Sequence, residues 1–149
     1  MSIKKRSGRL KVVLDLAEKR KKEAERFLAE QIQRVENDKQ QLVQLELYLA
    51  EYQQGYRQDS AQGLSIDRML NYQGFMNKIS VAIEQHKKSM LMNEKQLAQV
   101  KQYWAQMHGK YKAIDSLVVK ALDDEVKAVD KVLQKELDER SQLSRITYL

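Results

Sequence analysis

The sequence lacks cysteine and proline altogether and has only five glycines among its 149 residues. A chain of this length with average composition would carry roughly seven prolines and ten glycines. Sandwiches, barrels and α/β domains need many turns, and turns are built largely from such residues, so the composition argues against these folds. The absence of cysteine excludes a disulfide framework and thiolate metal or redox chemistry, and it fits a reducing compartment.

Long apolar runs are missing as well. No run approaches the roughly 18 residues that a membrane-spanning helix requires. The N-terminal segment MSIKKRSGRLK contains basic residues but no apolar core of a signal peptide. We therefore expect a soluble, nearly all-helical protein of one domain, residues 1–149, without a transmembrane segment.

The net charge of +6 is concentrated at one end of the chain. Residues 1–26 hold ten basic and four acidic side chains, a net charge of +6, and the remaining residues hold 17 of each sign. The basic end therefore predicts an acidic partner, which could be a protein, a nucleic acid or an anionic lipid surface.

Apolar residues follow a heptad pattern on both sides of one break. From Leu10 to Tyr56, eleven of the fourteen positions on a strict 4,3 spacing are apolar; from Met69 to Val132, sixteen of nineteen are. Heptads sustained over this length indicate a coiled coil. The break at residues 57–68 contains Gly63 and a helix-capping serine, Ser65. We expect a helix over about 8–57, a turn over about 58–66 and a helix over about 67–140.

The two heptad tracks match each other when residues whose numbers add up to 128 are paired. This register places Ala24 opposite Trp104 and Leu49 opposite Ile79, and it places no polar core residue opposite another. Small residues face large ones, as close packing requires. The sequence therefore predicts an all-α fold, an antiparallel two-helix coiled coil, paired from Leu10 to Val118. Residues 119–149 then lack a partner and carry an apolar stripe: Leu122, Val126, Val129, Leu133 and Leu137.

No catalytic motif is visible. The two histidines, His86 and His108, stand in no metal-binding pattern, and no glycine-rich phosphate loop exists. His86 lies on the core track, where the simplest interpretation is a polar residue of the helix interface. We expect a protein that is not an enzyme and that binds no metal or cofactor.

The basic N-terminal residues allow several interpretations. Nucleic-acid binding would need stacking aromatics or a groove-reading element, and residues 1–26 contain no aromatic residue. Binding to a membrane surface would need bulky apolar residues opposite the cations, of which Val12, Val13, Leu14 and Leu16 offer some. Binding to an acidic protein surface needs only the charge. A merely solvated helix end is the fourth possibility.

A third feature lies near the turn. Two sets of residues share the spacing i, i+4, i+7, i+11 and fall side by side in the predicted register: Gln41, Leu45, Tyr48 and Tyr52, with Phe75, Ile79, Ala82 and His86. Half of each set lies on the core track, whereas Gln41, Tyr48, Phe75 and Ala82 lie on a flank. Aromatic residues on such a flank are typical binding anchors. Alternatively, they serve only to widen the core. The spacing alone slightly favours this second interpretation.

Residues 71–86 resemble a known family. The string NYQ-x-F followed by AIEQH is similar to the signature of the flagellar export protein family FliJ. The segment LDLAEKR at residues 14–20 and the pair Tyr48 and Tyr52 also resemble that family. The resemblance covers essentially the whole chain and is weakest after about residue 120.

The resemblance implies a fold, partners and a location. Members are antiparallel coiled coils similar to the central shaft of rotary F-type ATPases. They act in the cytoplasm, peripheral to the inner face of the cell membrane at the flagellar base. The implied partners are the hexameric export ATPase FliI, the cytoplasmic domain of the export gate FlhA, and export chaperones. No nucleic acid is implied, and we expect a monomer when the protein is isolated.

The resemblance also implies two sets of binding residues. The positions that match the gate-contacting surface are Gln41, Leu45, Tyr48, Tyr52, Phe75, Ile79, Ala82 and His86, which favours the docking interpretation of these residues. By analogy with a shaft, the ATPase would be contacted by Lys4, Lys5, Arg6, Arg9, Lys11, Lys19, Arg20 and Lys22. A generic structural coiled coil, or a basic hairpin that binds nucleic acid or lipid, remains the alternative.

Overall fold

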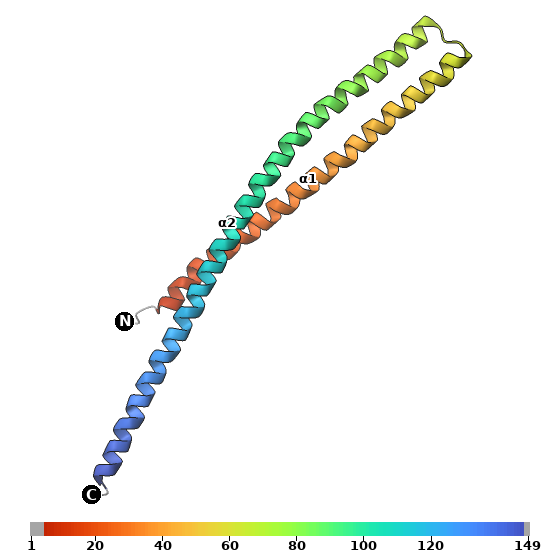
Figure 1. Cartoon of the computed structure of the whole chain (residues 1–149). Coiled ribbons are helices and arrows are strands. Elements are labelled where there is room, and N and C mark those ends of the chain that lie inside the picture. Colours follow the sequence, from red (N-terminus) through yellow and green to blue (C-terminus); the bar gives the residue numbers. More distant parts are fainter. Residues whose placement is uncertain (1–4, 148–149) are drawn as a thin grey trace. The chain divides into compact units, whose positions relative to one another are not determined.

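The computed structural model describes residues 5–147 and contains two long helices, α1 (Arg6–Gln62) and α2 (Ile66–Thr147). No strand occurs among these residues. The prediction of an all-α fold is confirmed. Figure 1 shows both helices as long continuous ribbons. The sequence contains no proline that could kink them.

The turn is shorter than the sequence suggested. Helix α1 continues to Gln62 and α2 begins at Ile66, so that only residues 63–65 separate them. Gly63 has a φ of 93°, the left-handed conformation that ends many helices and that glycine adopts without strain. The predicted cap is confirmed, because the backbone N–H of Arg68 donates to the Ser65 hydroxyl at 3.3 Å. Asp59 and Ser60 therefore lie within the last turn of α1 and do not break it.

The chain divides into two units, each formed by one part of α1 and one part of α2. The turn unit comprises Ala24–Trp104, and the terminal unit comprises Met1–Glu23 with Ala105–Leu149. In each unit the two helical parts pair in antiparallel directions. The organisation of residues 1–149 as one domain stays a prediction.

The heptad positions form the core of both units. All fourteen predicted positions of α1 are buried or half-buried, and so are those of α2 from Met69 to Glu125. Ala24, Val35 and Ile83 are buried in the turn unit, whereas Ala17, Met107, Val118 and Ala121 are buried in the terminal unit. Only Ala128 and Val132, at the end of the second track, are exposed. The pattern therefore predicted which face of each helix packs.

Ring contacts in the turn unit agree with the predicted register. Tyr56 packs against Tyr72, a pair whose numbers add up to 128, and Tyr52 stacks on Phe75, one residue off that sum. The seam that joins the helices of this unit is therefore in the expected alignment.

Polar core residues contact one another diagonally across this seam, which the register of opposite residues did not predict. The side-chain amide of Asn93 donates to the Asp38 carboxylate at 2.7 Å, and His86 Nε2 lies 2.7 Å from the Asp38 backbone carbonyl oxygen. The amide of Gln31 donates to the Asn93 backbone carbonyl at 2.9 Å. The register places Met90 opposite Asp38, and these polar side chains reach diagonally to partners one helical turn away. The prediction that no polar core residue stands opposite another therefore holds for the register but does not describe these diagonal contacts.

In the terminal unit, helix pairing extends further than expected. The Ser7 hydroxyl donates to the Glu125 carboxylate at 2.8 Å, and the Ser7 N–H donates to its other oxygen at 3.2 Å. Ser7 and Ala121 are both buried. The paired region therefore reaches Glu125 rather than ending at Val118, because Ser7 continues the heptad spacing of α1 by one position.

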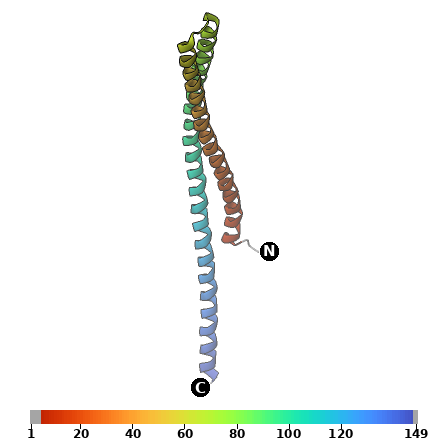
Figure 2. The same ribbon diagram turned by 90° about the vertical axis from the view of Figure 1, so that its right-hand side faces the viewer.

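Beyond Glu125, helix α2 continues past the described start of α1 (Figures 1 and 2). The predicted apolar stripe lies on this part of the helix and on the turn before it. Its five side chains are 40–58% exposed: Leu122, Val126, Val129, Leu133 and Leu137. The stripe is thus an apolar surface that α1 does not cover.

Candidate protein-docking surface near the turn

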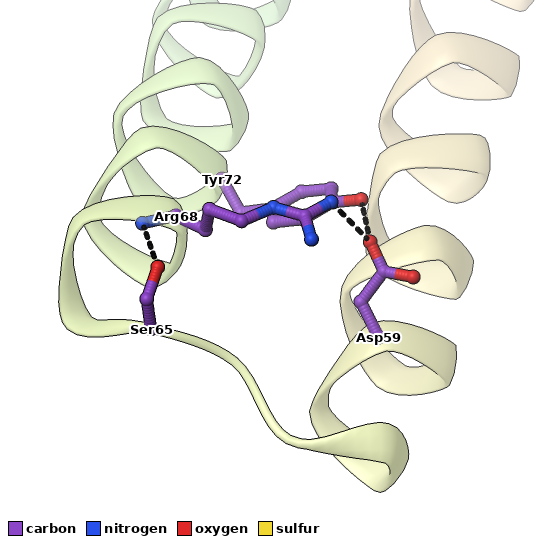
Figure 3. A network of polar contacts seen from close by, with 4 residues as sticks. All are labelled: Asp59, Ser65, Arg68 and Tyr72. Carbon is purple, nitrogen blue, oxygen red and sulfur yellow. Dashed lines mark hydrogen bonds and ion pairs between the residues drawn. The ribbon is translucent and has the colours of Figure 1, made fainter.

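The candidate site lies at the end of the turn unit where α1 passes into α2. Figure 3 shows Asp59 of α1 facing Tyr72 and Arg68 of α2, beside the Ser65 cap. The Tyr72 hydroxyl and the Arg68 guanidinium both donate to the same carboxylate oxygen of Asp59, the latter at 3.4 Å. The network ties together the two helices next to the three-residue turn.

Charge explains why Asp59 needs these partners. The last turn of α1 contains no basic residue, and a carboxylate there is disfavoured by the negative end of the helix dipole. Arg68 supplies the missing positive charge from the other helix. The hydrogen bond to Asp59 is also the main reason why the pKa of Tyr72 is raised, since it favours the protonated phenol; burial of the ring acts in the same direction.

Four aromatic rings lie next to this network. Tyr72 makes edge contacts with Tyr52 and Tyr56, at centroid distances of 6.5 and 5.8 Å. Tyr52 also stacks on Phe75, with centroids 5.6 Å apart and planes within 17°. Edge-to-face and offset-stacked pairs of this kind stabilise an interface by more free energy than their buried area alone accounts for. The rings therefore form one continuous cluster across the seam.

An open hollow of about 230 Å³ adjoins the cluster. Its walls are Tyr52, Arg68, Asn71, Tyr72 and Phe75. Aromatic faces thus stand beside a guanidinium and an amide, which is the combination that protein interfaces commonly use for anchoring.

The structure places the eight predicted gate-contacting residues at two levels of exposure. Tyr48 and Phe75 are 56% and 51% exposed, and Gln41 is exposed too. The other five are half-buried: Leu45, Tyr52, Ile79, Ala82 and His86. Tyr52 and Phe75 are in direct contact. The large flank aromatics are therefore accessible to a partner while the core-track members support them.

His86 has the structural role that its place on the core track predicts. It contacts the backbone of Asp38 and belongs to the polar group in the seam. Its interpretation as a polar residue of the helix interface is therefore confirmed, and its contact with a partner stays a prediction.

Sequence reasoning missed the network of Asp59, Arg68 and Tyr72. Tyr72 lies on the predicted core track and in the NYQ-x-F string, and Asp59 lies within the break predicted at residues 57–68, and neither pattern indicates a contact between them. One signal could have found the network: an acidic residue close to a helix C-terminus, where it is unfavourable, suggests a compensating partner on the neighbouring helix.

The predicted ATPase-contacting residues lie in the terminal unit. Seven of the eight fall within the described residues, and all seven are exposed: Lys5, Arg6, Arg9, Lys11, Lys19, Arg20 and Lys22. Lys4 lies outside the described residues. Lys22 makes an ion pair with Glu18 at 3.4 Å on the same helix. The arrangement is a cationic surface on α1, open to a partner.

One carboxylate lies near these cations. The hydrogen bond from the Ser7 hydroxyl is the main reason why the pKa of Glu125 is lowered, and Lys5 and Lys11 act in the same direction. Glu125 thus anchors the start of α1 to α2.

Residues 5–147 contain neither a membrane-spanning segment nor a metal-binding group. Neither described helix has a segment long and apolar enough to cross a membrane. Within the same part of the chain, no group of histidine, aspartate and glutamate side chains is arranged to hold a metal ion.

Comparison with known proteins connects these features to one family. A family model described as "Flagellar FliJ protein" matches residues 6–147. The Flagellar FliJ protein of Salmonella typhi is 28% identical over 135 residues, which cover 91% of this chain and 92% of the relative. That of Escherichia coli strain K12 is 27% identical over the same length and coverage. No solved structure matches the chain.

Proposed function

We propose, since the chain belongs to the FliJ family, that this component of flagellar protein export is a non-enzymatic coiled-coil stalk. One end of the stalk binds the pore of the hexameric export ATPase FliI, and the turn unit docks on the cytoplasmic domain of the export gate FlhA. The same protein escorts export chaperones. These contacts place it in the cytoplasm, at the inner face of the membrane below the flagellum.

The observation that carries gate docking is the exposure of Tyr48 and Phe75 on paired helices. Large aromatic side chains that remain half exposed are costly in water and are frequent anchors of protein interfaces. The rings next to them are held by edge and stacking contacts, so the surface is ordered before a partner arrives. Such preorganisation lowers the entropy cost of binding.

The exposed cations of the terminal unit support contact with the ATPase. Lys5 directly precedes α1, and Arg6, Arg9 and Lys11 lie in its first two turns. Lys19, Arg20 and Lys22 follow further along the helix. An acidic pore would attract them at long range and hold them by pairing. The proposal that the surface binds protein rather than nucleic acid is supported by the lack of aromatic residues within residues 1–26.

The test of gate docking separates binding from packing. Tyr48→Ala and Phe75→Ala should each weaken binding to the purified FlhA cytoplasmic domain by about 2 kcal/mol, as central aromatics commonly do. Their melting temperatures should change little, because both side chains are half exposed. Affinity is measured by calorimetry and stability by circular dichroism.

Leu49→Ala and Ile83→Ala are the matched controls, since both are core-track residues outside the predicted contact set. They should lower the melting temperature first, because each leaves a cavity in the seam. If Tyr48→Ala and Phe75→Ala keep full gate affinity but lose stability, these aromatics only widen the core. A generic scaffold function would then fit better.

A further inference from the structure

Tyr72 is one of the two inner rings of the aromatic cluster, with Tyr52, although it lies outside the predicted contact set. It touches both Tyr52 and Tyr56, and Tyr52 in turn stacks on Phe75. Two of the predicted contact residues, Tyr52 and Phe75, are therefore linked to Tyr72 directly or through one ring. Any rotation of the Tyr72 ring would change what Tyr52 packs against.

The surroundings leave this ring room to move. The hollow of about 230 Å³ lies along it, open to solvent. On the opposite helix stands Gly55, where a Cβ atom would lie 3.5 Å from the Tyr72 hydroxyl oxygen. A glycine offers no side chain to hold the phenol end. The hydrogen bond to Asp59 is the contact that fixes that end of the ring (Figure 3).

The position of Asp59 supports a role beyond stability. A carboxylate in the last turn of a helix opposes the helix dipole, and aspartate has a low helix propensity. Asp59 is nevertheless placed there, half-buried, with its carboxylate bonded to Tyr72 and Arg68. An alanine would suit the helix better but could not hold the tyrosine.

We propose that Tyr72 is a positioning residue of the docking surface. Its hydroxyl is fixed by Asp59, and its ring then sets the orientation of Tyr52 and, through the stack, of Phe75. This inference rests on the proposed docking to the export gate. It extends the functional part of the surface to Asp59 and Tyr72, which face each other across the turn.

The test removes the hydrogen bond without removing a ring. Tyr72→Phe keeps the aromatic ring and loses the hydroxyl, whereas Asp59→Ala removes the acceptor and improves the helix end. Each should weaken binding to the purified FlhA cytoplasmic domain about tenfold. The melting temperature should be nearly unchanged for Tyr72→Phe and equal or higher for Asp59→Ala. The double variant should bind no worse than either single variant, because all three lack the same bond.

Tyr56→Phe is the matched control. The Tyr56 ring contacts Tyr72 in the same edge geometry, and its hydroxyl makes no hydrogen bond within the described part of the chain. This variant should bind as the wild type does. A second readout needs no partner: nuclear Overhauser contacts between the Tyr52 ring and the ring at position 72 should weaken in Tyr72→Phe and persist in Tyr56→Phe.

The outcomes separate this inference from the proposed function. If Tyr48→Ala weakens gate binding while Tyr72→Phe and Asp59→Ala bind normally with ordered rings, docking stands and Tyr72 has no positioning role. If the wild-type chain does not bind the gate domain at all, the proposed docking falls, and the positioning role in docking falls with it.

Discussion

The turn unit and the terminal unit use the same heptad pattern but differ in what lies beside it. In the turn unit, polar and aromatic side chains meet across the seam, as in the Asp38–Asn93 and Tyr52–Phe75 contacts. In the terminal unit, α1 ends its pairing at Ser7 while α2 continues with an exposed apolar stripe. One unit presents a surface that is ordered in advance, and the other presents exposed cations and apolar side chains that are not covered.

The largest effect is expected from the cations of the terminal unit. Reversing Lys19, Arg20 and Lys22 to glutamate should weaken binding to the export ATPase by at least about a hundredfold and abolish its stimulation. Each reversal replaces an attraction of about 0.5 kcal/mol by a comparable repulsion, so three reversals cost about 3 kcal/mol, and about 1.4 kcal/mol corresponds to tenfold. Wild-type binding should weaken as salt is added, because exposed charges are screened beyond about 10 Å at 0.1 M.

The matched control reverses Lys127, Lys131 and Lys135, three exposed lysines of the same unit on α2. Lys127 makes an ion pair four residues away, as Lys22 does, so both sets lose one such contact. Both triple variants should keep wild-type helicity. The predicted residues would have no specific role in two cases. In the first, the variant of Lys19, Arg20 and Lys22 stimulates the export ATPase normally. In the second, both triple variants lose the same amount of stimulation.

An intermediate effect should distinguish the covered seam from the uncovered stripe. Ile83→Ala should lower the free energy of unfolding by about 2–4 kcal/mol, because Ile83 is 7% exposed and its truncation leaves a cavity. Leu133→Ala should change it by less than about 0.5 kcal/mol, because Leu133 is 52% exposed. Urea unfolding followed by helicity and by fluorescence of the single tryptophan, Trp104, measures both. Equal losses would mean that the stripe is packed in solution.

The smallest effects are expected at opposite ends of the pH scale. Glu125 has a lowered pKa in the folded protein. Its contribution to the free energy of unfolding is therefore present above the ordinary glutamate pKa and is lost as the pH falls through the lower folded pKa. Tyr72 has a raised pKa in the folded protein. Its contribution to the free energy of unfolding is therefore complete below the ordinary tyrosine pKa of about 10 and is lost as the pH rises through the higher folded pKa.

Two variants isolate these contributions. The difference in unfolding free energy between wild type and Ser7→Ala should shrink in acid, and that between wild type and Tyr72→Phe should shrink in alkali. Both groups are exposed enough that the changes will be small. A difference that stays constant with pH would mean that the hydrogen bond concerned does not depend on ionisation.

The seam could be predicted from sequence because it depends on a repeated spacing. The heptads identified the covered positions from Leu10 to Glu125, and glycine and serine placed the turn within a short window. The contacts of Asp38 and Asp59 could not be predicted in this way. They depend on how far individual side chains reach along the helices, and register alone gives only the residue directly opposite.

The candidate surface was predictable in part. The exposure of Tyr48 and Phe75 follows from their flank positions, and the family resemblance pointed to the same residues. The tie between Tyr72 and Asp59 requires the final turn of α1 to extend past residue 57, which the polar residues of the break obscured. Small errors at a helix end thus hide the contacts that form there.

The continuation of α2 beyond Glu125 has a consequence for its motion. Residues 126–147 would span about 30 Å as a helix, yet most of the stability of a helix in a protein comes from packing of its apolar face, and here that face is exposed. The backbone hydrogen bonds of an uncovered helix break and re-form on the microsecond scale or faster. Amide protons in this segment should therefore exchange with solvent far sooner than those beside the seam. Any protein that covers the stripe would slow that exchange, turning a fluctuating helix into a fixed one.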